Sequence, residues 1–506
     1  MVDVDPTPYP LDHLALRGSS SALALIDREG GLDYAGLELE VGALAASLAA
    51  RGFGKGDRIA SWLPKVRATC LLPLACARAG LVHVPINPLL KRAQVAHILS
   101  DSGARLLVTG EARDGSLEAG DVPGNCVVAL EEETRAMIGG ADALPPSDAD
   151  PDALAALLYT SGSTGRPKGV MLSNANMWLG AVSVASYLGL GSSDRTLGVL
   201  PLSFDYGQNQ LLSGWYAGGC VVPLDYITAR DVVRAVERHE ITTLAGVPPL
   251  WVQLIESDWP GTAPLRLRRL TNSGGRLPVS MVRRMQEMFP IADIYLMYGL
   301  TEAFRSTYLD PALVGTHPDS IGAAIPLAEV LVVRADGSPT DADEPGELVH
   351  AGPLVAQGYW RDPERTRQRF RPAPPASRLG GTAVWSGDRV RRDSDGLLYF
   401  VGREDAMIKT SGNRVSPTEI EEAAISSGLA AEAVALGVPD DRLGEAILLI
   451  VRPTEKGEPR DAELRIYLKR ELPNFMQPAS IAWRNELPRN PNGKLDREKL
   501  KSEMMA

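Results

Sequence analysis

Apolar residues recur at helical spacing early in the chain, at Leu37, Val41, Leu44 and Leu48. Positions three or four residues apart line one face of a helix. Short apolar runs follow at intervals, in RIASWLP, LVHVPIN and RLLVTG. Runs of this length are typical of strands that are buried on both faces. The alternation predicts α/β layering, with helices covering the faces of sheets.

The same alternation continues between residues 198 and 298. We expect strands at GVLPL, CVVPLDY, TTLAGV and DIYLMY, and a helix over ARDVVRAVERHE. An acidic, proline-containing stretch, IGGADALPPSDADPDA, precedes the apolar run ALAALLYT. We interpret the stretch as a surface connector and the run as a buried strand.

The pattern changes near residue 403. The last hundred residues predict a compact mixture of helices at PTEIEEAAISS and AELRIYLKREL with strands at AVALGVP and AILLIV. A chain of 506 residues also exceeds what one hydrophobic core usually serves. We therefore expect a large N-terminal domain of layered α/β sheets, residues 1–404, and a small α+β C-terminal domain, residues 405–506.

Composition and charge exclude several classes of protein. The hydrophobic fraction of 44% and the charged fraction of 23% are typical of globular proteins. The net charge is −11 and no block of Lys and Arg occurs, which argues against nucleic acid or an anionic membrane surface as a partner. We expect no membrane span, no signal peptide, four core cysteines and a cytoplasmic location.

The strongest local motif is YTSGSTGRPKG, which follows the predicted strand ALAALLYT. Its glycines let backbone N–H groups approach an oxyanion, and its hydroxyls and one lysine add donors and a positive charge. The motif predicts a phosphate site, although a flexible polar loop has a similar composition. The candidate ligands are Thr160, Ser161, Gly162, Ser163, Thr164 and Lys168.

Further motifs occur downstream in the order YGLTE, SGD, GRED, KTSGNRVSPTEIEE and LPRNPNGKLDR. Taken singly, each is also typical of a turn or a helix start. Together with the first motif, they resemble the adenylate-forming superfamily of acyl-CoA synthetases, peptide-synthetase adenylation domains and luciferases. The resemblance covers nearly the whole chain, with Ser386 standing where the family more often has threonine.

The resemblance implies roles for individual residues. Thr301 and Glu302 would face the phosphates of ATP, with Glu302 as a Mg²⁺ ligand, and Asp388 and Arg403 would bind the ribose hydroxyls. The remaining nucleotide contacts implied are Gly274, Gly275, Tyr298 and Gly299. Lys494 would catalyse adenylation, Asp405 would be the hinge of a mobile C-terminal domain, and Gly412 would line the thiol tunnel.

The reaction that the resemblance implies has two steps. A carboxylate and MgATP give acyl-AMP and pyrophosphate, and a thiol then displaces AMP. The thiol would belong to CoA or to the phosphopantetheine arm of a free-standing carrier protein. The six histidines show no arrangement typical of a catalytic triad.

The acid itself is suggested by residues that match the family's acyl pocket. Asp205 aligns with the aspartate that pairs with the α-ammonium group in amino-acid-activating members, so an amino acid is one candidate. Arg305 could instead neutralise Asp205 or bind a second carboxylate. The other pocket positions are Tyr206, Asn209, Gly246, Thr271, Ser273, Met297 and Ser306, a moderately polar set that favours a small acid.

At finer resolution the chain resembles AMP-forming acyl-CoA ligases associated with bacterial exosortase systems. Two alternatives remain open on the sequence alone. One is a luciferase-like oxygenase that acts on an acyl-adenylate, and the other is a catalytically silent nucleotide-binding regulator. The motif around Gly412 argues against the first, and Lys168, Glu302, Asp388 and Lys494 argue against the second.

Overall fold

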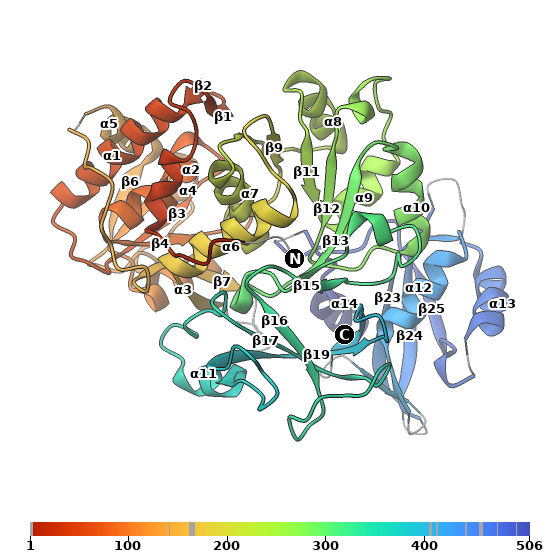
Figure 1. The fold of residues 1–506 in the computed structure, drawn as a ribbon. Coiled ribbons are helices and arrows are strands. Elements are labelled where there is room, and N and C mark those ends of the chain that lie inside the picture. Colours follow the sequence, from red (N-terminus) through yellow and green to blue (C-terminus); the bar gives the residue numbers. More distant parts are fainter. Residues whose placement is uncertain are drawn as a thin grey trace.

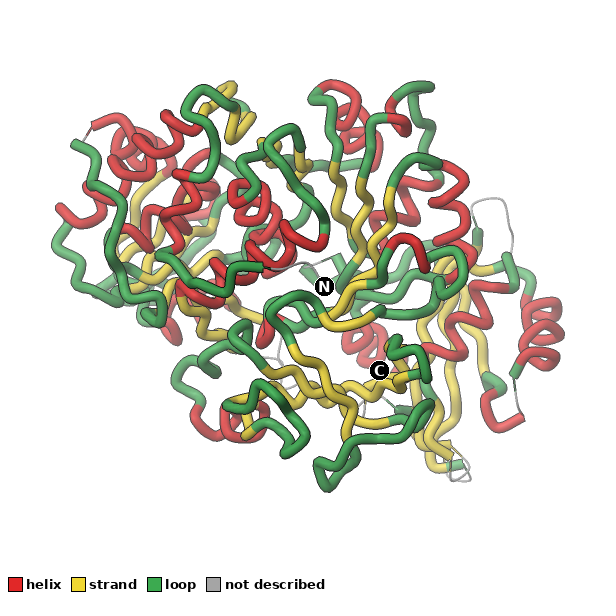
Figure 2. The backbone as a smooth tube through the Cα atoms, viewed as in Figure 1, coloured by secondary structure: helices red, strands yellow, loops and turns green. Residues whose placement is uncertain are grey.

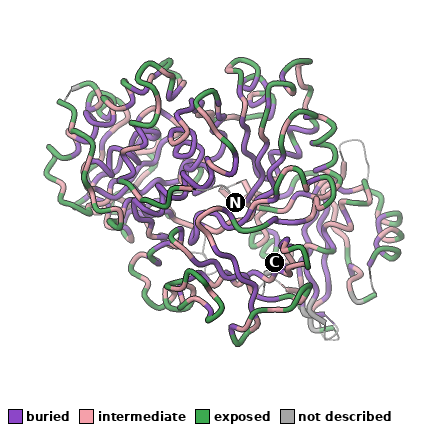
Figure 3. The backbone as a smooth tube through the Cα atoms, viewed as in Figure 1, coloured by how far each residue is buried: buried purple, intermediate pink, exposed green. Residues whose placement is uncertain are grey.

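The structure is a computed structural model that describes residues 4–140, 142–160, 167–403, 407–410, 413–440, 443–454, 459–472, 474–491 and 493–505. Within these residues the chain forms three sheets before residue 404 and one sheet after residue 406 (Figure 1). Helices and loops lie around the sheets (Figure 2), and central strands such as β4 and β11 belong to the buried backbone (Figure 3). No helix in the described part is long and apolar enough to cross a membrane.

The first sheet has the strand order β6-β5-β3-β4-β7-β8, in which only the β7–β8 pair is antiparallel. Its strands are β3 Arg58–Trp62, β4 Val82–Pro85, β5 Leu106–Thr109, β6 Val127–Leu130, β7 Leu154–Thr160 and β8 Lys168–Ser173. The elements before and between them are η1 Leu11–Leu16, α1 Tyr34–Ala50, α2 Arg67–Arg78, α3 Arg92–Ser102, α4 Glu111–Asp114 and α5 Glu131–Gly140. The three strands and the helix predicted for this region are confirmed.

The second sheet has the order β15-β14-β13-β12-β11-β9-β10-β1-β2. Its strands are β1 Leu23–Asp27, β2 Gly30–Asp33, β9 Arg195–Gly198, β10 Cys220–Pro223, β11 Thr243–Gly246, β12 Arg269–Asn272, β13 Asp293–Tyr298, β14 Thr307–Tyr308 and β15 Ala323–Ala324. Between them lie α6 Asn174–Tyr187, α7 Asp205–Tyr216, α8 Ala229–Arg238, α9 Pro248–Ile255, η2 Ala263–Leu265, α10 Val279–Met288, η3 Thr301–Ala303 and η4 Pro311–Leu313.

One strand prediction in this sheet is wrong. The run GVLPL was expected to be a strand, but β9 ends at Gly198, where that run begins. Pairing with β10 matches Arg195 to Cys220 and ends at the pair of Gly198 with Pro223. Directly after this pair the Val199 N–H donates to the carbonyl of Leu197 at 3.2 Å, so the chain turns toward α7 instead of extending the strand.

The third sheet is antiparallel, in the order β16-β17-β19-β18 with β20 also paired to β19. Its elements are β16 Glu329–Val333, β17 Gly346–Ala351, α11 Pro363–Arg369, β18 Phe370–Pro372, β19 Thr382–Arg392 and β20 Leu398–Arg403. This sheet carries the SGD motif in the middle of β19, so Asp388 sits on a strand rather than in a loop.

The C-terminal elements form a fourth sheet with its own hydrophobic clusters. They are β21 Ile408–Thr410, β22 Asn413–Val415, α12 Pro417–Ser426, β23 Ala430–Asp440, β24 Gly444–Pro453, α13 Asp461–Glu471, η5 Asn474–Met476, β25 Ser480–Trp483 and α14 Arg497–Met505. The predicted helices and strands are confirmed. Ser416 precedes α12, but its hydroxyl donates to the carbonyl of Val401 at 2.6 Å rather than accepting from the helix.

The C-terminal elements contact the sheets of the N-terminal part directly. The Asn87 side chain donates to the carbonyl of Pro491 at 2.8 Å. Arg276, just after β12, forms an ion pair of 2.6 Å with Glu422 on α12. These contacts set the pose in which residues near 490 reach the second sheet.

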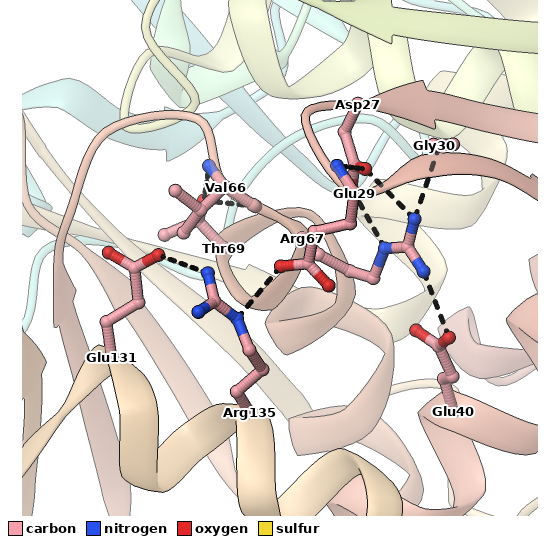
Figure 4. Close-up of polar contacts among 9 residues, drawn as sticks. All are labelled: Asp27, Glu29, Gly30, Glu40, Val66, Arg67, Thr69, Glu131 and Arg135. Carbon is pink, nitrogen blue, oxygen red and sulfur yellow. Dashed lines mark hydrogen bonds and ion pairs between the residues drawn. The ribbon is translucent and has the colours of Figure 1, made fainter.

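Ion pairs also join the β1–β2 hairpin to neighbouring helices (Figure 4). Arg67 at the start of α2 pairs with Asp27 at 2.9 Å and with Glu40 at 3.1 Å, and it is mostly buried. Arg135 on α5 pairs with Glu29 and Glu131, both at 3.1 Å. In each of these ion pairs the two charged side chains neutralise each other. We therefore interpret the contacts between the β1–β2 hairpin, α1, α2 and α5 as structural.

Candidate active site

The carboxyl ends of β11, β12 and β13 meet at one edge of the second sheet. The parallel register aligns Gly246 with Asn272 and Asn272 with Leu296. Ser273 and Tyr298 therefore lie at the same edge, followed by the loops that carry Gly274 and Gly299. Ligands of open α/β sheets bind at this edge, where loops can approach them closely.

The phosphate motif is described only at its two flanks, because Ser161, Gly162, Ser163 and Thr164 lie outside the described residues. Thr160 ends β7 opposite Lys168, which begins β8. The Lys168 ammonium donates to the Tyr359 hydroxyl at 2.7 Å and to Glu302 at 3.3 Å. The Thr160 hydroxyl is buried without a hydrogen-bond partner in the described part of the chain.

Charge is balanced between Lys168 and Glu302. Burial lowers the pKa of Lys168, and the negative charge of Glu302 opposes that shift. Burial would raise the pKa of Glu302, but Lys168, Arg369 and the Tyr359 hydroxyl hold it below its ordinary value. The lowered pKa of Glu302 favours its carboxylate form, which is the form that binds a divalent cation.

The donor set around Glu302 suits Mg²⁺. In the described residues no three His, Cys, Asp or Glu side chains are grouped to hold a metal alone. Mg²⁺ usually keeps several waters and takes one or two carboxylates together with substrate phosphates. Glu302 can supply one carboxylate beside the phosphate motif.

The ribose candidates lie on neighbouring strands. The Asp388 carboxylate accepts a hydrogen bond of 2.5 Å from the Tyr298 hydroxyl, and its backbone N–H donates to Ser386. Burial and the charge of Asp388 raise the pKa of Tyr298 well above its ordinary value. Arg403 stands opposite Asp388 in the β19–β20 pairing. The Asp388 carboxylate is thus held in a position suited to accept hydrogen bonds from hydroxyl groups.

A small cavity lies between α6, α7 and the second sheet. Hydroxyl, amide and aromatic side chains line it beside a few aliphatic ones. The lining residues are Val184, Tyr187, Leu188, Leu190, Thr196, Tyr206, Asn209, Gln210, Ser213, Thr243, Ala245, Thr271, Met297 and Arg305. Tyr206, Asn209, Thr271, Met297 and Arg305 are the pocket residues expected from the sequence that border this cavity.

The other expected pocket residues lie around the cavity rather than on its wall. Ser273 accepts a hydrogen bond from Arg305 at 2.9 Å. Ser306 shares a hydrogen bond of 2.9 Å with His350, whose pKa burial lowers to about 4. At Gly246 a Cβ atom would come within 2.8 Å of the Trp251 ring. Gly246 therefore allows the close approach of that indole.

Asp205 and Arg305 are both buried, at 3% and 2% exposure, but they have different partners. Asp205 begins α7 and accepts a hydrogen bond of 2.9 Å from Thr301. Arg305 donates to Ser273, and its guanidinium carbon lies 4.5 Å from the Tyr206 ring centroid. In the described part of the chain the two form no ion pair within 4.0 Å.

Lys494 reaches this site from the C-terminal part. A Cβ atom built on Gly274 would lie 2.8 Å from Lys494 Cε and 3.4 Å from Nζ. Gly274 also has a φ of +79°, which favours glycine. The ammonium lies 5.2 Å from the Phe204 ring centroid, beside the start of α7. Lys494 is thus brought next to the second sheet, and it is also close enough to Asp205 to oppose the rise in its pKa.

Sequence reasoning missed two residues of this site, Tyr359 and Arg369. The Tyr359 hydroxyl donates to Glu302 at 2.6 Å, and the Lys168 ammonium lies 3.9 Å from its ring centroid. Arg369 adds positive charge to the same cluster. Tyr359 lies in the uncharged tripeptide GYW after β17, and nothing in that tripeptide indicates a site.

Comparison with known proteins agrees with this geometry. Residues 12–360 match the model of the AMP-binding enzyme family, and residues 419–494 match that of the AMP-binding enzyme C-terminal domain. The chain is 35% identical over 488 residues to a sulfoacetate–CoA ligase of Cupriavidus necator, covering 94% of this chain and 93% of the relative.

Solved structures give the same result. ATP-bound MatB from Rhodopseudomonas palustris superposes with a TM-score of 0.89 at 25% identity, covering 98% of this chain and 99% of that one. The o-succinylbenzoate CoA synthetase MenE of Bacillus subtilis, in complex with its acyl-adenylate intermediate, gives a TM-score of 0.84 at 27% identity, covering 98% of each chain. The chain belongs to the AMP-binding enzyme family and is an ATP-dependent, AMP-forming acid–thiol ligase.

Proposed function

We propose that this ligase adenylates a small carboxylic acid in the cavity between α6, α7 and the second sheet, and that CoA accepts the acyl group. The contact of Lys494 with Gly274 carries the proposal. A cation at this edge can attract both the substrate carboxylate and the α-phosphate of ATP.

In the first step a carboxylate oxygen would attack the α-phosphorus, and the bond to pyrophosphate would break. Lys494 would align the attack and stabilise the negative charge on the phosphorus. Thr160, Lys168 and the phosphate motif would hold the triphosphate, with Thr301, Gly274, Gly275 and Gly299 around it. Asp388, Tyr298 and Arg403 would hold the nucleoside. Mg²⁺ bound through Glu302 would shield phosphate charge.

In the second step the thiolate would attack the acyl carbon, and AMP would leave. We propose that the C-terminal domain begins at residue 405 and rotates about Asp405, which brings the loop of Gly412 to the acyl group. Asp405 and Gly412 lie outside the described residues. The separate hydrophobic clusters on the two sides of this boundary support a movement of the C-terminal domain as a unit.

The sulfoacetate–CoA ligase supports CoA as the acceptor, because the match extends along 93% of that relative. A free-standing carrier protein presents the same thiol and is the alternative for an amino-acid substrate. Use of cytosolic ATP and CoA, together with four buried free cysteines, favours action in the cytoplasm.

Pyrophosphate release with MgATP and hydroxylamine tests the first step across monocarboxylic acids, dicarboxylic acids and amino acids. We expect one class of small acids to turn over, and we expect CoA to replace hydroxylamine in a second assay. Turnover with hydroxylamine but not with CoA would contradict the proposed acceptor and direct the search to carrier proteins. No turnover with any acid would contradict the proposed adenylation.

A further inference from the structure

We propose that the acid carries a second oxyanion, a carboxylate or a sulfonate, which the Arg305 guanidinium binds inside the cavity. This inference rests on the proposed function, because the reacting carboxylate of the same molecule must face Lys494. Under this proposal Arg305 is the residue that makes the enzyme prefer short acids with two anionic groups.

Arg305 has binding capacity that the described protein does not use. Its side chain is 2% exposed, yet its Nη1 donates only to the neutral hydroxyl of Ser273, and its Nε is buried without a partner in the described residues. The Tyr206 ring covers one face of the guanidinium. A buried cation is costly unless an anion and further hydrogen bonds compensate it. The planar fork of arginine is suited to bind a carboxylate or a sulfonate.

The cavity wall combines apolar side chains with a few groups that can donate to an anion. None of the described lining residues is acidic, and Arg305 is their only cation. Gln210 Nε2 and the Thr243 hydroxyl are buried without partners in the described part of the chain, and both can donate to an oxyanion. An alkyl or aryl tail would leave these groups and the guanidinium unpaired, which penalises such a substrate.

Asp205 does not require an amine on the substrate. It accepts from Thr301 and begins α7, where the helix N-terminus stabilises negative charge. Burial raises its pKa, and Arg305 opposes that rise. Asp205 is absent from the described wall of the cavity. An occupant of the cavity therefore meets Arg305, and Asp205 is stabilised by the protein itself.

The two ends of the proposed substrate must be close together. Ser273, which accepts from Arg305, directly precedes Gly274, which contacts Lys494. At Gly299 a Cβ atom would lie 3.3 Å from Arg305 Nη1, so the guanidinium also borders the nucleotide loop. The short span between Lys494 and Arg305 favours acids with few atoms between their two anionic groups.

Matched pairs of acids test the proposal by pyrophosphate release. The pairs are malonate against propionate, succinate against butyrate, and sulfoacetate against acetate, with alanine and aspartate as amine-bearing probes. We expect the doubly anionic member of at least one pair to have the higher kcat/KM by more than ~10-fold. Arg305→Met should lower that value by roughly 100-fold, and this loss should be at least about 10-fold larger than the loss for the matched monoacid.

Arg305→Lys should recover part of the loss, because it restores charge without the planar fork. Melting curves with and without AMP check that both variants fold and keep the nucleotide site. If Arg305→Met does not fold, Ser273→Ala, which removes the described partner of the guanidinium, should still lower kcat/KM for the diacid more than for the monoacid. Turnover of monoacids or amino acids alone would overturn the Arg305 assignment and leave the ligase function intact. A lack of turnover with every acid would overturn both.

Discussion

The Lys168 ammonium lies 3.3 Å from Glu302 Oε1, and the Tyr359 hydroxyl contacts both groups. The pair joins the phosphate motif on β8 to the YGLTE motif after β13. Tyr359 holds the two opposite charges at a fixed separation. Under the proposed function Lys168 would contact a phosphate and Glu302 would contact Mg²⁺, so removal of the hydroxyl should weaken both contacts.

We expect Tyr359→Phe to lower kcat/KM for ATP by about 10-fold, as loss of hydrogen bonds to charged groups implies. The Mg²⁺ concentration required for half-maximal rate should rise as well. Pyrophosphate release measured over a range of ATP and Mg²⁺ concentrations checks both effects. Tyr399→Phe is the matched control, because that hydroxyl donates to Asp393 on the third sheet. Equal kinetics for the two variants would contradict a role for Tyr359.

Lys494 contacts Gly274 in this structure, and the proposed rotation of the C-terminal domain would separate the two residues. We expect Lys494→Ala to lower the rate of adenylation by at least about 100-fold, the usual effect of removing a group that stabilises transition-state charge. Thioester formation from supplied acyl-AMP and CoA should stay within about 3-fold of the wild type. The exposed Lys499 on α14 provides the control Lys499→Ala. An equal loss of both half-reactions would argue against domain rotation.

Much of the fold could be predicted from sequence, because buried strands must be apolar. RIASWLP and DIYLMY became β3 and β13. GVLPL failed because the chain turns at Val199, whose N–H donates to the carbonyl of Leu197 and not to a neighbouring strand. An apolar run predicts that a segment is buried. The residue at which a strand ends depends instead on where its backbone groups form hydrogen bonds.

The candidate site was less predictable, since its partners come from distant motifs. The sequence left Asp205 and Arg305 open as partners of each other, and the structure directs them to Thr301 and Ser273. Tyr359 gave no signal because a tyrosine beside a glycine is also common in cores. The resemblance supplied residue types, but the orientation of each side chain depends on packing that one sequence does not reveal.

The role of Asp205 can be separated from that of Arg305 by pairs of acids that differ only in an amine. The pairs are propionate with alanine and succinate with aspartate, in which the second acid carries the amine. We expect Asp205→Asn to lower kcat/KM about 10-fold for both members of each pair, because the substitution weakens the contact with Thr301. Pyrophosphate release gives these values, and Asp395→Asn on an exposed turn is the control. A loss confined to alanine and aspartate would restore the pairing of Asp205 with a substrate amine.

The buried carboxyl group of Glu422 should make the stability of the fold depend on pH. Burial raises the pKa of Glu422 from its ordinary value of 4.5 to about 7, with Arg276 opposing the shift and Asp319 and Glu421 adding to it. As the pH falls from about 7 toward 4.5, Glu422 of the folded state therefore takes up a proton, whereas the same glutamate in the unfolded chain stays largely ionised. Through this window the contribution of Glu422 to stability becomes more favourable as pH falls.

At pH 8 the folded state must keep a buried carboxylate ionised, and Glu422→Gln removes that cost. We expect the variant to raise Tm at pH 8 by roughly 2 °C and by much less near pH 5, where Glu422 is already neutral in the folded state. Calorimetry at both pH values gives the difference. Glu419→Gln, exposed in the first turn of the same helix, is the control. A lower Tm for Glu422→Gln at pH 8 would mean that the ion pair with Arg276 outweighs the cost of burying the charge.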